Sequence, residues 1–209
     1  MVLTRDDDGR LVSASGRVFD AWDWQWSKPE SGRPGAEPLT ASQALRVVTA
    51  TPRRRLLPVG VIGPKAASAR QYETARVLGR ALAGLGLPVL SGGREGVMEA
   101  VAEGASGAGG LCLAFLPDDD WRTANAHVAM PLATGIGKAR NVLIAQASLA
   151  LIAIGGEYGT LSEIAFGLHF GKPVFALEDA PDIRGVEHHG SVGSLCEALA
   201  ARLLGDPAD

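Results

Sequence analysis

The sequence predicts an α/β protein: a Rossmann-like, doubly wound parallel sheet preceded by a short β-rich extension. From residue 56 onward, short apolar runs alternate with stretches whose apolar positions recur about every 3.6 residues, and glycine-rich turns join them. One run, Leu149–Ile154, is continuously apolar, as expected of a strand buried on both faces. We therefore expect an extension over residues 1–57 and the main domain over residues 58–209.

The extension has its own local signals. Asp8-Gly9 lies between two apolar pairs and predicts a hairpin turn. Residues 16–26 alternate large apolar and polar side chains, which predicts one half-buried strand. On such a strand one face would carry Trp22, Trp24 and Trp26. That face either covers the main domain or a partner subunit, or forms an aromatic ligand platform. Thr40 and Gln43 form a capping-box pattern that predicts a helix ending near residue 48.

The main domain is expected to alternate strands with helices. Strands are predicted at 57–62, 87–90, 110–116, 128–132, 149–154 and 173–177. Helices are predicted at 69–85, 95–105, 137–147, 158–170 and 193–204, with 188–189 in a polar loop. Ligands of such sheets bind beyond the carboxyl ends of the strands. The turns at 63–68, 91–98 and 155–163 are therefore where we expect function to lie.

Composition excludes several classes of function. The chain has 209 residues with a formal net charge of -3. It lacks the clustered Lys and Arg that bind phosphate backbones, so we expect no nucleic-acid partner. Cys112 and Cys196 are far apart, and neither they nor the four histidines show metal-ligand spacing, so neither a disulfide nor a metal site is expected. No apolar run approaches about 18 residues and the N-terminal residues lack an apolar signal segment, which favours a cytoplasmic protein without a membrane partner.

Two glycine-rich turns are candidate anion sites. Glycines let the backbone approach a phosphate closely, and the free N–H groups at the start of the following helix attract it. Purely steric turn geometry is the alternative for either turn alone. Neither turn is a Walker A motif or a GxGxxG motif followed by an acidic residue, so a monophosphate fits better than ATP or NAD. The candidate phosphate ligands in these turns are Gly92, Gly93, Gly96, Gly155, Gly156, Gly159 and Thr160.

Two charged residues are candidates for chemistry beside the phosphate. Glu163 lies one helical turn beyond Gly159 and can face the same pocket, or else it complements the helix dipole. Arg140 could hold a ribose, a phosphate or Glu163, or else be a solvated helix residue. The turn before Arg140 adds two candidate ligands, Thr134 and Gly135. Further pocket candidates are Gly63, Ser68, Met98, Asn125 and Asn141.

These motifs resemble those of the Lonely Guy (LOG) family of Rossmann-like proteins. SGGREGVM is similar to the family's GGGxxGLM turn, and GGEYGTLSE is similar to its PGGxGTxxE signature. With KARN between them, the motifs have the family's order and spacing over residues 57–178. The chain departs from the pattern where Ile154 replaces the signature proline, where Glu157-Tyr158 fills the signature's variable position, and where Asn141 follows Arg140 in place of lysine.

The resemblance implies an activity and an alternative to it. The cytokinin-activating members hydrolyse the N-glycosidic bond of nucleoside 5′-monophosphates, and their catalytic pair corresponds to Glu163 and Arg140. The wording of the motifs looks closer to a neighbouring branch that includes uncharacterised bacterial nucleotide-binding proteins and the molybdenum-cofactor carriers, which bind a pterin bearing a phosphate. The alternative that this branch implies is a non-catalytic carrier or sensor of molybdenum cofactor or a nucleotide. The resemblance thus implies a bound nucleotide or molybdenum cofactor, no required cofactor, and a homo-oligomer, either a dimer or a tetramer. The residues that recognise the base or pterin are expected near 118–127.

Overall fold

The computed structural model describes residues 2–29 and 32–205. The chain forms two compact units. The first comprises the chain up to Leu56 together with the chain from Cys196 onward, and the second is Leu57–Leu195. The expected division into an extension over residues 1–57 and a main domain over residues 58–209 stays a prediction.

The second unit contains a seven-stranded sheet in which every neighbouring pair is parallel, which confirms the expected α/β class. Its spatial order is β11-β10-β9-β5-β6-β7-β8. The strands are β5 (Val59–Ile62), β6 (Val89–Ser91), β7 (Cys112–Leu116), β8 (Met130–Ala133), β9 (Leu151–Ile154), β10 (Val174–Leu177) and β11 (Val186–His188). The chain builds outward from β5 to β8, then returns to the other side of β5 with β9, so the strand order reverses between β5 and β9. Crevices at such a reversal are the usual ligand sites.

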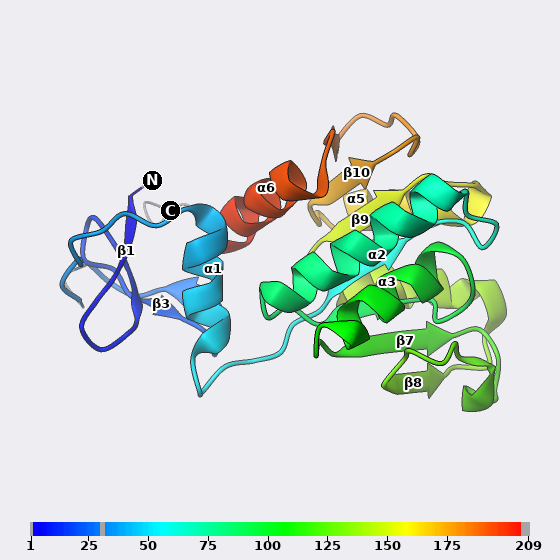
Figure 1. Ribbon diagram of the computed structural model, residues 1–209, viewed down its shortest axis with the longest axis horizontal. Coiled ribbons are helices and arrows are strands. Elements are labelled where there is room, and N and C mark those ends of the chain that lie inside the picture. The colour runs from blue at the N-terminus through cyan, green and yellow to red at the C-terminus, as the bar shows by residue number, and fades with distance from the viewer. Residues whose placement is uncertain (1, 30–31, 206–209) are drawn as a thin grey trace. The chain divides into compact units, whose positions relative to one another are not determined.

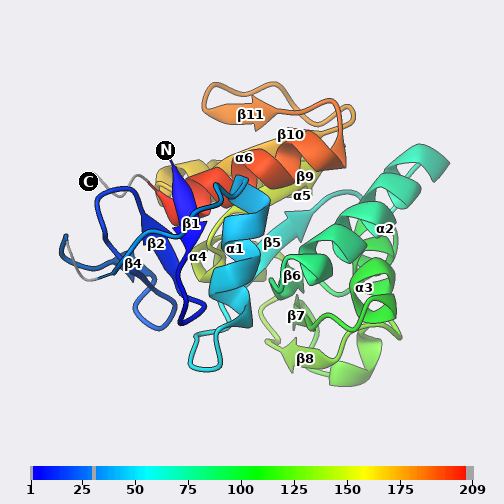
Figure 2. The same ribbon diagram turned by 60° about the vertical axis from the view of Figure 1, so that its left-hand side comes forward.

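Helices cover both faces of this sheet. They are α2 (Ala69–Gly84), α3 (Val97–Gly107), α4 (Asn141–Ala147) and α5 (Tyr158–His169). Helix α6 (Val192–Leu204) is divided between the two units, which separate at Cys196. Figure 1 shows α2 and α3 in front of the sheet and α5 behind it. Figure 2 shows β11 next to β10 at one edge of the sheet and β8 at the other. Helix α2 begins with a capping box between Ser68 and Gln71.

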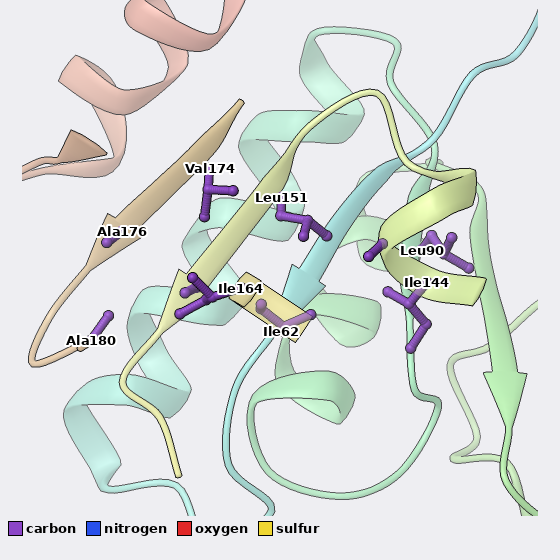
Figure 3. Packing of buried hydrophobic residues seen from close by; sticks show 10 residues of the cluster. Ile62, Leu90, Ile144, Leu151, Ile164, Val174, Ala176 and Ala180 are labelled. Carbon is purple, nitrogen blue, oxygen red and sulfur yellow. The ribbon is translucent and has the colours of Figure 1, made fainter. Parts of the chain in front are cut away.

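The core behind the sheet joins strands to α4 and α5. Ile144 of α4 and Ile164 of α5 pack with Ile62 and Leu151 of the two central strands, all 2% exposed or less (Figure 3). Each such side chain contributes about 1.5–3 kcal/mol when fully buried. This packing fixes the helices that carry the candidate charged residues against the strands that end at the glycine turns.

Two elements of the second unit differ from expectation. The predicted helix over 137–147 is a 3₁₀ turn, η2 (Gly137–Arg140), followed by the short α4. Gly137 has φ +60° and donates its N–H to Pro117, which prevents a regular helical start. The predicted polar loop at 188–189 overlaps β11, an edge strand of three residues. Its sequence, Val-Glu-His, is too short and too polar to signal a strand.

The first unit begins with the expected hairpin. Strands β1 (Leu3–Arg5) and β2 (Leu11–Ser13) pair antiparallel, and Gly9 in the connecting turn has φ +81°. The predicted helix after Thr40 is α1 (Ala41–Ala50), and its capping box with Gln43 is formed. The local signals of the extension therefore predicted both elements correctly.

The tryptophan segment corrects a prediction. Instead of one strand over 16–26, the structure has two short paired strands, β3 (Phe19–Asp20) and β4 (Gln25–Trp26). The carboxylate of Asp20 accepts the N–H groups of residues 22 and 23, which bends the chain. The three tryptophans therefore do not share a strand face. The indole N–H groups of Trp24 and Trp26 donate to Leu203 and Leu204 at the end of α6, while Trp22 lies under Arg53 and Arg55.

The cysteines fit the expected buried, unpaired state. Cys112 and Cys196 are both free and buried. Burial raises the pKa of the Cys112 thiol to about 12, which keeps it protonated and unreactive. Within the described residues, no group of three or more His, Cys, Asp or Glu side chains is arranged to hold a metal ion. The helices described for this chain include none that is both long and apolar enough to cross a membrane.

Candidate functional site

The second glycine turn lies at the carboxyl end of β9. Gly155 has φ +58°, and a Cβ there would lie 2.2 Å from Nε2 of Gln71, so only glycine fits. A Cβ on Gly159 would meet no atom within 4 Å, so this side of the turn is open. Among the described residues, the N–H groups of Tyr158, Gly159 and Thr160 have no hydrogen-bond acceptor. The start of α5 therefore presents free donors of the kind that bind phosphate.

The first glycine turn lies at the carboxyl end of β6, on the other side of β5. Gly93 and Gly96 have φ of +69° and +71°, and Ser91 Oγ accepts the N–H of Gly93 at 3.1 Å. The first amide of α3, that of Val97, donates to the carbonyl of Pro64 at 3.2 Å. This turn therefore uses the first of its helix-start donors internally, whereas the first three N–H groups of α5 have no acceptor among the described residues.

Gly92 connects the first turn to the candidate charged residues. A Cβ on Gly92 would lie 2.3 Å from Nη2 of Arg140 and 2.8 Å from Sδ of Met98. The guanidinium of Arg140 thus occupies the space that a side chain at residue 92 would take. Met98 is buried and forms part of the same wall. Gly92, Met98 and Arg140, all predicted from the sequence, lie together.

Glu163 and Arg140 form a buried ion pair. Arg140 is the last residue of η2 and Glu163 lies in the second turn of α5. Arg140 Nη1 donates to Glu163 Oε1 at 3.1 Å, and the two residues are only 8% and 7% exposed. Arg140 Nε is also buried and has no hydrogen-bond partner in the described part of the chain. The two residues that the resemblance pairs are therefore in contact, but they are buried and their charged groups bind each other.

Burial controls the ionisation of this pair. It raises the pKa of the Glu163 carboxyl to about 7, and the attraction of Arg140 offsets only part of that rise. Burial also lowers the pKa of the Arg140 guanidinium, with Glu163 opposing the change. A carboxyl with a pKa near neutrality can exchange protons at physiological pH, which is the property required of a general acid or base.

Asn141 holds the pair in place. Its Oδ1 accepts a hydrogen bond from Arg140 Nη1, and its Nδ2 donates to Ser162 Oγ at 2.9 Å and to the carbonyl of Gly159 at 3.4 Å. Ser162 Oγ in turn donates to the same carbonyl at 2.6 Å. The amide side chain therefore ties η2 to the first turn of α5. The sequence marked Asn141 as a pocket candidate but gave no sign of Ser162.

The acidic loop after β7 is fastened to the first glycine turn. Asn125 donates its backbone N–H to Gly93 and its side-chain Nδ2 to the carbonyl of Arg94, at 2.9 and 3.0 Å. Arg94 forms an ion pair with Asp118 at the start of the loop. The loop expected to recognise the organic part of a ligand thus lies at the first turn, as its predicted role requires. That role itself stays a prediction.

The remaining candidates have structural partners. The Thr134 hydroxyl donates to the carbonyl of Leu116 at 2.7 Å, and Gly135, with φ +66°, donates its N–H to Asp118. Gly63 lies where a Cβ would be 2.7 Å from the carbonyl of Ile154, so it lets β5 and β9 end close together. Ser68 caps α2. These residues shape the site, and the side chains of Thr134 and Ser68 have partners within the protein.

A groove of about 530 Å³ opens at the carboxyl end of β10, beside the second turn. Its lining includes Gln71, Glu178 and Asp179, which the sequence analysis did not select, and it does not include Glu163. Two sequence signals were available. Gln71 completes the Ser68 capping box, and Glu178 and Asp179 are the first two residues after β10.

We expect Glu163 to make the protein less stable as the pH rises. The folded-state pKa of about 7 exceeds the ordinary value of 4.5, so the folded state binds this proton more tightly. The contribution is complete below pH 4.5 and is lost as the pH rises through 7, by about 3 kcal/mol at most. Melting temperatures of the wild type and Glu163→Gln between pH 5 and 8 test this, because the glutamine cannot titrate. A difference between the two proteins that is constant over this range would contradict the prediction.

Comparisons with known proteins agree with this geometry. The chain matches the SLOG cluster4 family over residues 56–201. It belongs to the SLOG cluster4 family. The match covers the whole parallel sheet and both glycine turns of this family member, consistent with the LOG-like resemblance of its motifs.

Three known proteins are similar to this SLOG protein in sequence or in structure. An uncharacterised protein from Archaeoglobus fulgidus is 42% identical over 132 residues, which is 63% of this chain and 87% of that protein. The molybdenum cofactor binding protein from Rippkaea orientalis is 33% identical with a TM-score of 0.66, covering 69% of this chain and 96% of that one. The molybdenum cofactor carrier protein from Chlamydomonas reinhardtii is also 33% identical with a TM-score of 0.66, covering 73% and 100% of the two chains.

Proposed function

We propose that this protein binds a phosphate-bearing small molecule at the carboxyl ends of the central strands, and that it is a carrier of molybdenum cofactor, a pterin that bears a phosphate. The phosphate lies on the free N–H groups of Tyr158, Gly159 and Thr160 at the start of α5. The similarity to two proteins whose titles name molybdenum cofactor supports this choice of ligand.

The observation that favours a carrier over an enzyme is the closure of the Glu163–Arg140 pair. A catalytic carboxylate must reach the reacting bond or its attacking water, within hydrogen-bond distance or through one water. Glu163 is 7% exposed and faces Arg140, and it does not line the groove beside the second turn. In this arrangement the carboxylate is an internal partner of Arg140 and not a group that faces a ligand.

A second function, hydrolysis of the N-glycosidic bond of a nucleoside 5′-monophosphate, is favoured by the pKa of about 7 at Glu163. In that reaction the bond between C1′ and the base breaks, a water oxygen adds to C1′, and the base leaves with a proton. Glu163 would stabilise the positive charge on the ribose and activate the water, and Arg140 would orient the ribose. This requires the pair to open when the ligand binds.

One experiment separates the two functions. The purified protein is incubated with a panel of nucleoside 5′-monophosphates and with neopterin monophosphate, and both binding and release of free base are measured. A carrier binds without releasing base, and Glu163→Gln changes its affinity by no more than about threefold, because the ligand does not touch this side chain. Glu73→Gln, an exposed carboxylate on α2, is the control.

Base release that disappears in Glu163→Gln but persists in Glu73→Gln would replace the carrier with the hydrolase. The homo-oligomer, whether dimer or tetramer, stays a proposal that rests on the resemblance. The absence of nucleic-acid and membrane partners and the cytoplasmic location likewise stay predictions.

A further inference from the structure

The groove beside the second glycine turn is polar and large enough for a small molecule. Its volume of about 530 Å³ lies in the range of ligand sites, roughly 300–1,000 Å³. It is bounded by the start of α2, by the residues that follow β10, and by the start of α6. No part of the Glu163–Arg140 pair lines it.

Two carboxylates lie in this groove, and only one of them is free. Glu178 accepts a hydrogen bond from Thr74 Oγ1 at 2.7 Å and forms an ion pair with Arg70 Nε at 2.5 Å, and its side chain is 13% exposed. Its charge is therefore neutralised by Arg70. Asp179 is exposed, and only its Oδ1 has a partner among the described residues, Nε2 of Gln71 at 2.8 Å. The second oxygen of Asp179 is left open to a ligand.

Gln71 fixes the direction of the Asp179 carboxylate. Its Oε1 accepts the N–H of Ser68 in the capping box of α2, and its Nε2 donates to Asp179 Oδ1. Both ends of the buried amide are thus used, so Asp179 is held by a side chain that cannot turn. A functional group supported in this way is preorganised for binding.

The groove borders the turn that carries the proposed phosphate site. A Cβ on Gly155 would lie 2.2 Å from Gln71 Nε2 and 3.4 Å from Asp179 Oδ1, so the turn backbone and the carboxylate are neighbours. A Cβ on Gly156 would lie 3.0 Å from Pro181, which follows Asp179 closely in the chain. A ligand whose phosphate lies on this turn can extend its organic part along the groove, away from Glu163.

We propose that Asp179 binds the 2-amino-4-oxopyrimidine edge of the ligand, the part that guanine and pterin share. This edge presents a ring N–H and an adjacent NH₂ group side by side. One can donate to the open Oδ2 of Asp179, and the other to Oδ1, which keeps a second acceptor site beside its bond from Gln71. Adenine presents an acceptor at the corresponding ring nitrogen and does not match. The inference rests on the proposed phosphate site and adds the class of heterocycle and the residue that reads it.

Calorimetric titration of the full chain tests the proposal with guanosine, inosine and adenosine 5′-monophosphates, 2′-deoxyguanosine 5′-monophosphate, neopterin monophosphate and inorganic phosphate. We expect the guanine and neopterin compounds to bind more tightly than the inosine compound, which lacks the NH₂ group, and the adenosine compound to bind most weakly of the nucleotides. In Asp179→Asn the amide NH₂ faces the donor edge, so affinity for guanine and neopterin compounds falls about tenfold or more. Inorganic phosphate binding is unchanged.

The control variant is Asp182→Asn, three positions further on, whose side chain is 99% exposed. It should leave every affinity unchanged. Tighter binding of neopterin monophosphate than of the guanine nucleotide would identify a pterin as the source of the edge, and the reverse would identify a nucleotide.

Four outcomes overturn the subsite. Equal affinity for guanosine and adenosine monophosphates, or an unchanged affinity in Asp179→Asn, shows that Asp179 does not read this edge while the phosphate site stands. If the wild type binds 2′-deoxyguanosine 5′-monophosphate more weakly than guanosine 5′-monophosphate, and discriminates in no other way among the nucleotides, Asp179 would be assigned to the ribose hydroxyls instead. If no phosphate-bearing probe binds, the proposed function fails and the subsite fails with it.

Discussion

Replacing Arg140 with methionine is expected to lower the free energy of unfolding by about 3–5 kcal/mol at pH 8, because it leaves the buried Glu163 carboxylate without its partner. The guanidinium also fills the space beside Gly92, where no side chain is present, so the substitution loses packing as well as charge. The loss should be smaller at pH 6, because a carboxyl with a raised pKa takes up a proton there.

The matched variants isolate the buried pair. In the double variant Arg140→Met with Glu163→Leu, apolar side chains replace both charges, and we expect most of the lost stability to return. Arg122→Met breaks an exposed ion pair with Asp120 and should cost no more than about 1 kcal/mol. Urea denaturation of the wild type, Arg140→Met, Glu163→Leu and the double variant gives the coupling between the two sites, and Arg122→Met serves as the exposed-pair control. A double variant as unstable as Arg140→Met would mean that the loss comes from packing beside Gly92 and not from an unpaired charge.

Replacing Gly104 with alanine is expected to lower the free energy of unfolding by about 3 kcal/mol, because α2 and α3 touch through their backbones. A Cβ on Gly104 would lie 1.9 Å from the carbonyl oxygen of Arg76, and a Cβ on Gly79 would lie 2.1 Å from that of Val101. Neither contact can be relieved by a side-chain rotation, so the two helices would have to separate.

Gly84→Ala is the control for this substitution. Gly84 is the last residue of α2, and a Cβ there would meet no atom within 4 Å. The alanine should leave stability unchanged or raise it by about 0.5–1 kcal/mol, since it reduces the freedom of the unfolded chain. Chemical denaturation measures both variants. Gly104→Ala within about 0.5 kcal/mol of the wild type would show that the helices separate at little cost.

The close contact of these helices also bears on the site. Ser68, the N-cap of α2, and Gln71 in its first turn line the groove, and α3 begins at the first glycine turn. A change in their spacing therefore moves the support of Asp179 relative to Gly92 and Met98. We expect Gly104→Ala to weaken ligand binding even where the protein stays folded.

Local signals in the sequence predicted most of the fold. Apolar runs such as Leu149–Ile154 have one stable environment, a strand covered on both faces, and the helical period between them requires helices on those faces. The hairpin at Asp8-Gly9 and the capping box at Thr40 are also local, since each depends on residues four or fewer positions apart. The motifs around Gly92 and Gly155 marked the two turns, and the family resemblance paired Glu163 with Arg140.

Other features depend on distant parts of the chain. The tryptophan segment alternates like a strand, but the Asp20 turn and the α6 carbonyls, 178 and 179 residues away from Trp26 and Trp24, decide its shape. Strand β11 is too short to signal itself and exists because β10 offers it an open edge.

The sequence by itself determined the parallel α/β architecture, both glycine turns and the residues of the Glu163–Arg140 pair, because each is encoded in a short, regular pattern. Only the tertiary structure decided that this pair is buried and closed on itself, and that Gln71 holds Asp179 in a groove beside Gly155. Burial and contacts between residues 108 positions apart arise when the strands assemble, and no pattern along the chain records which side chains then meet.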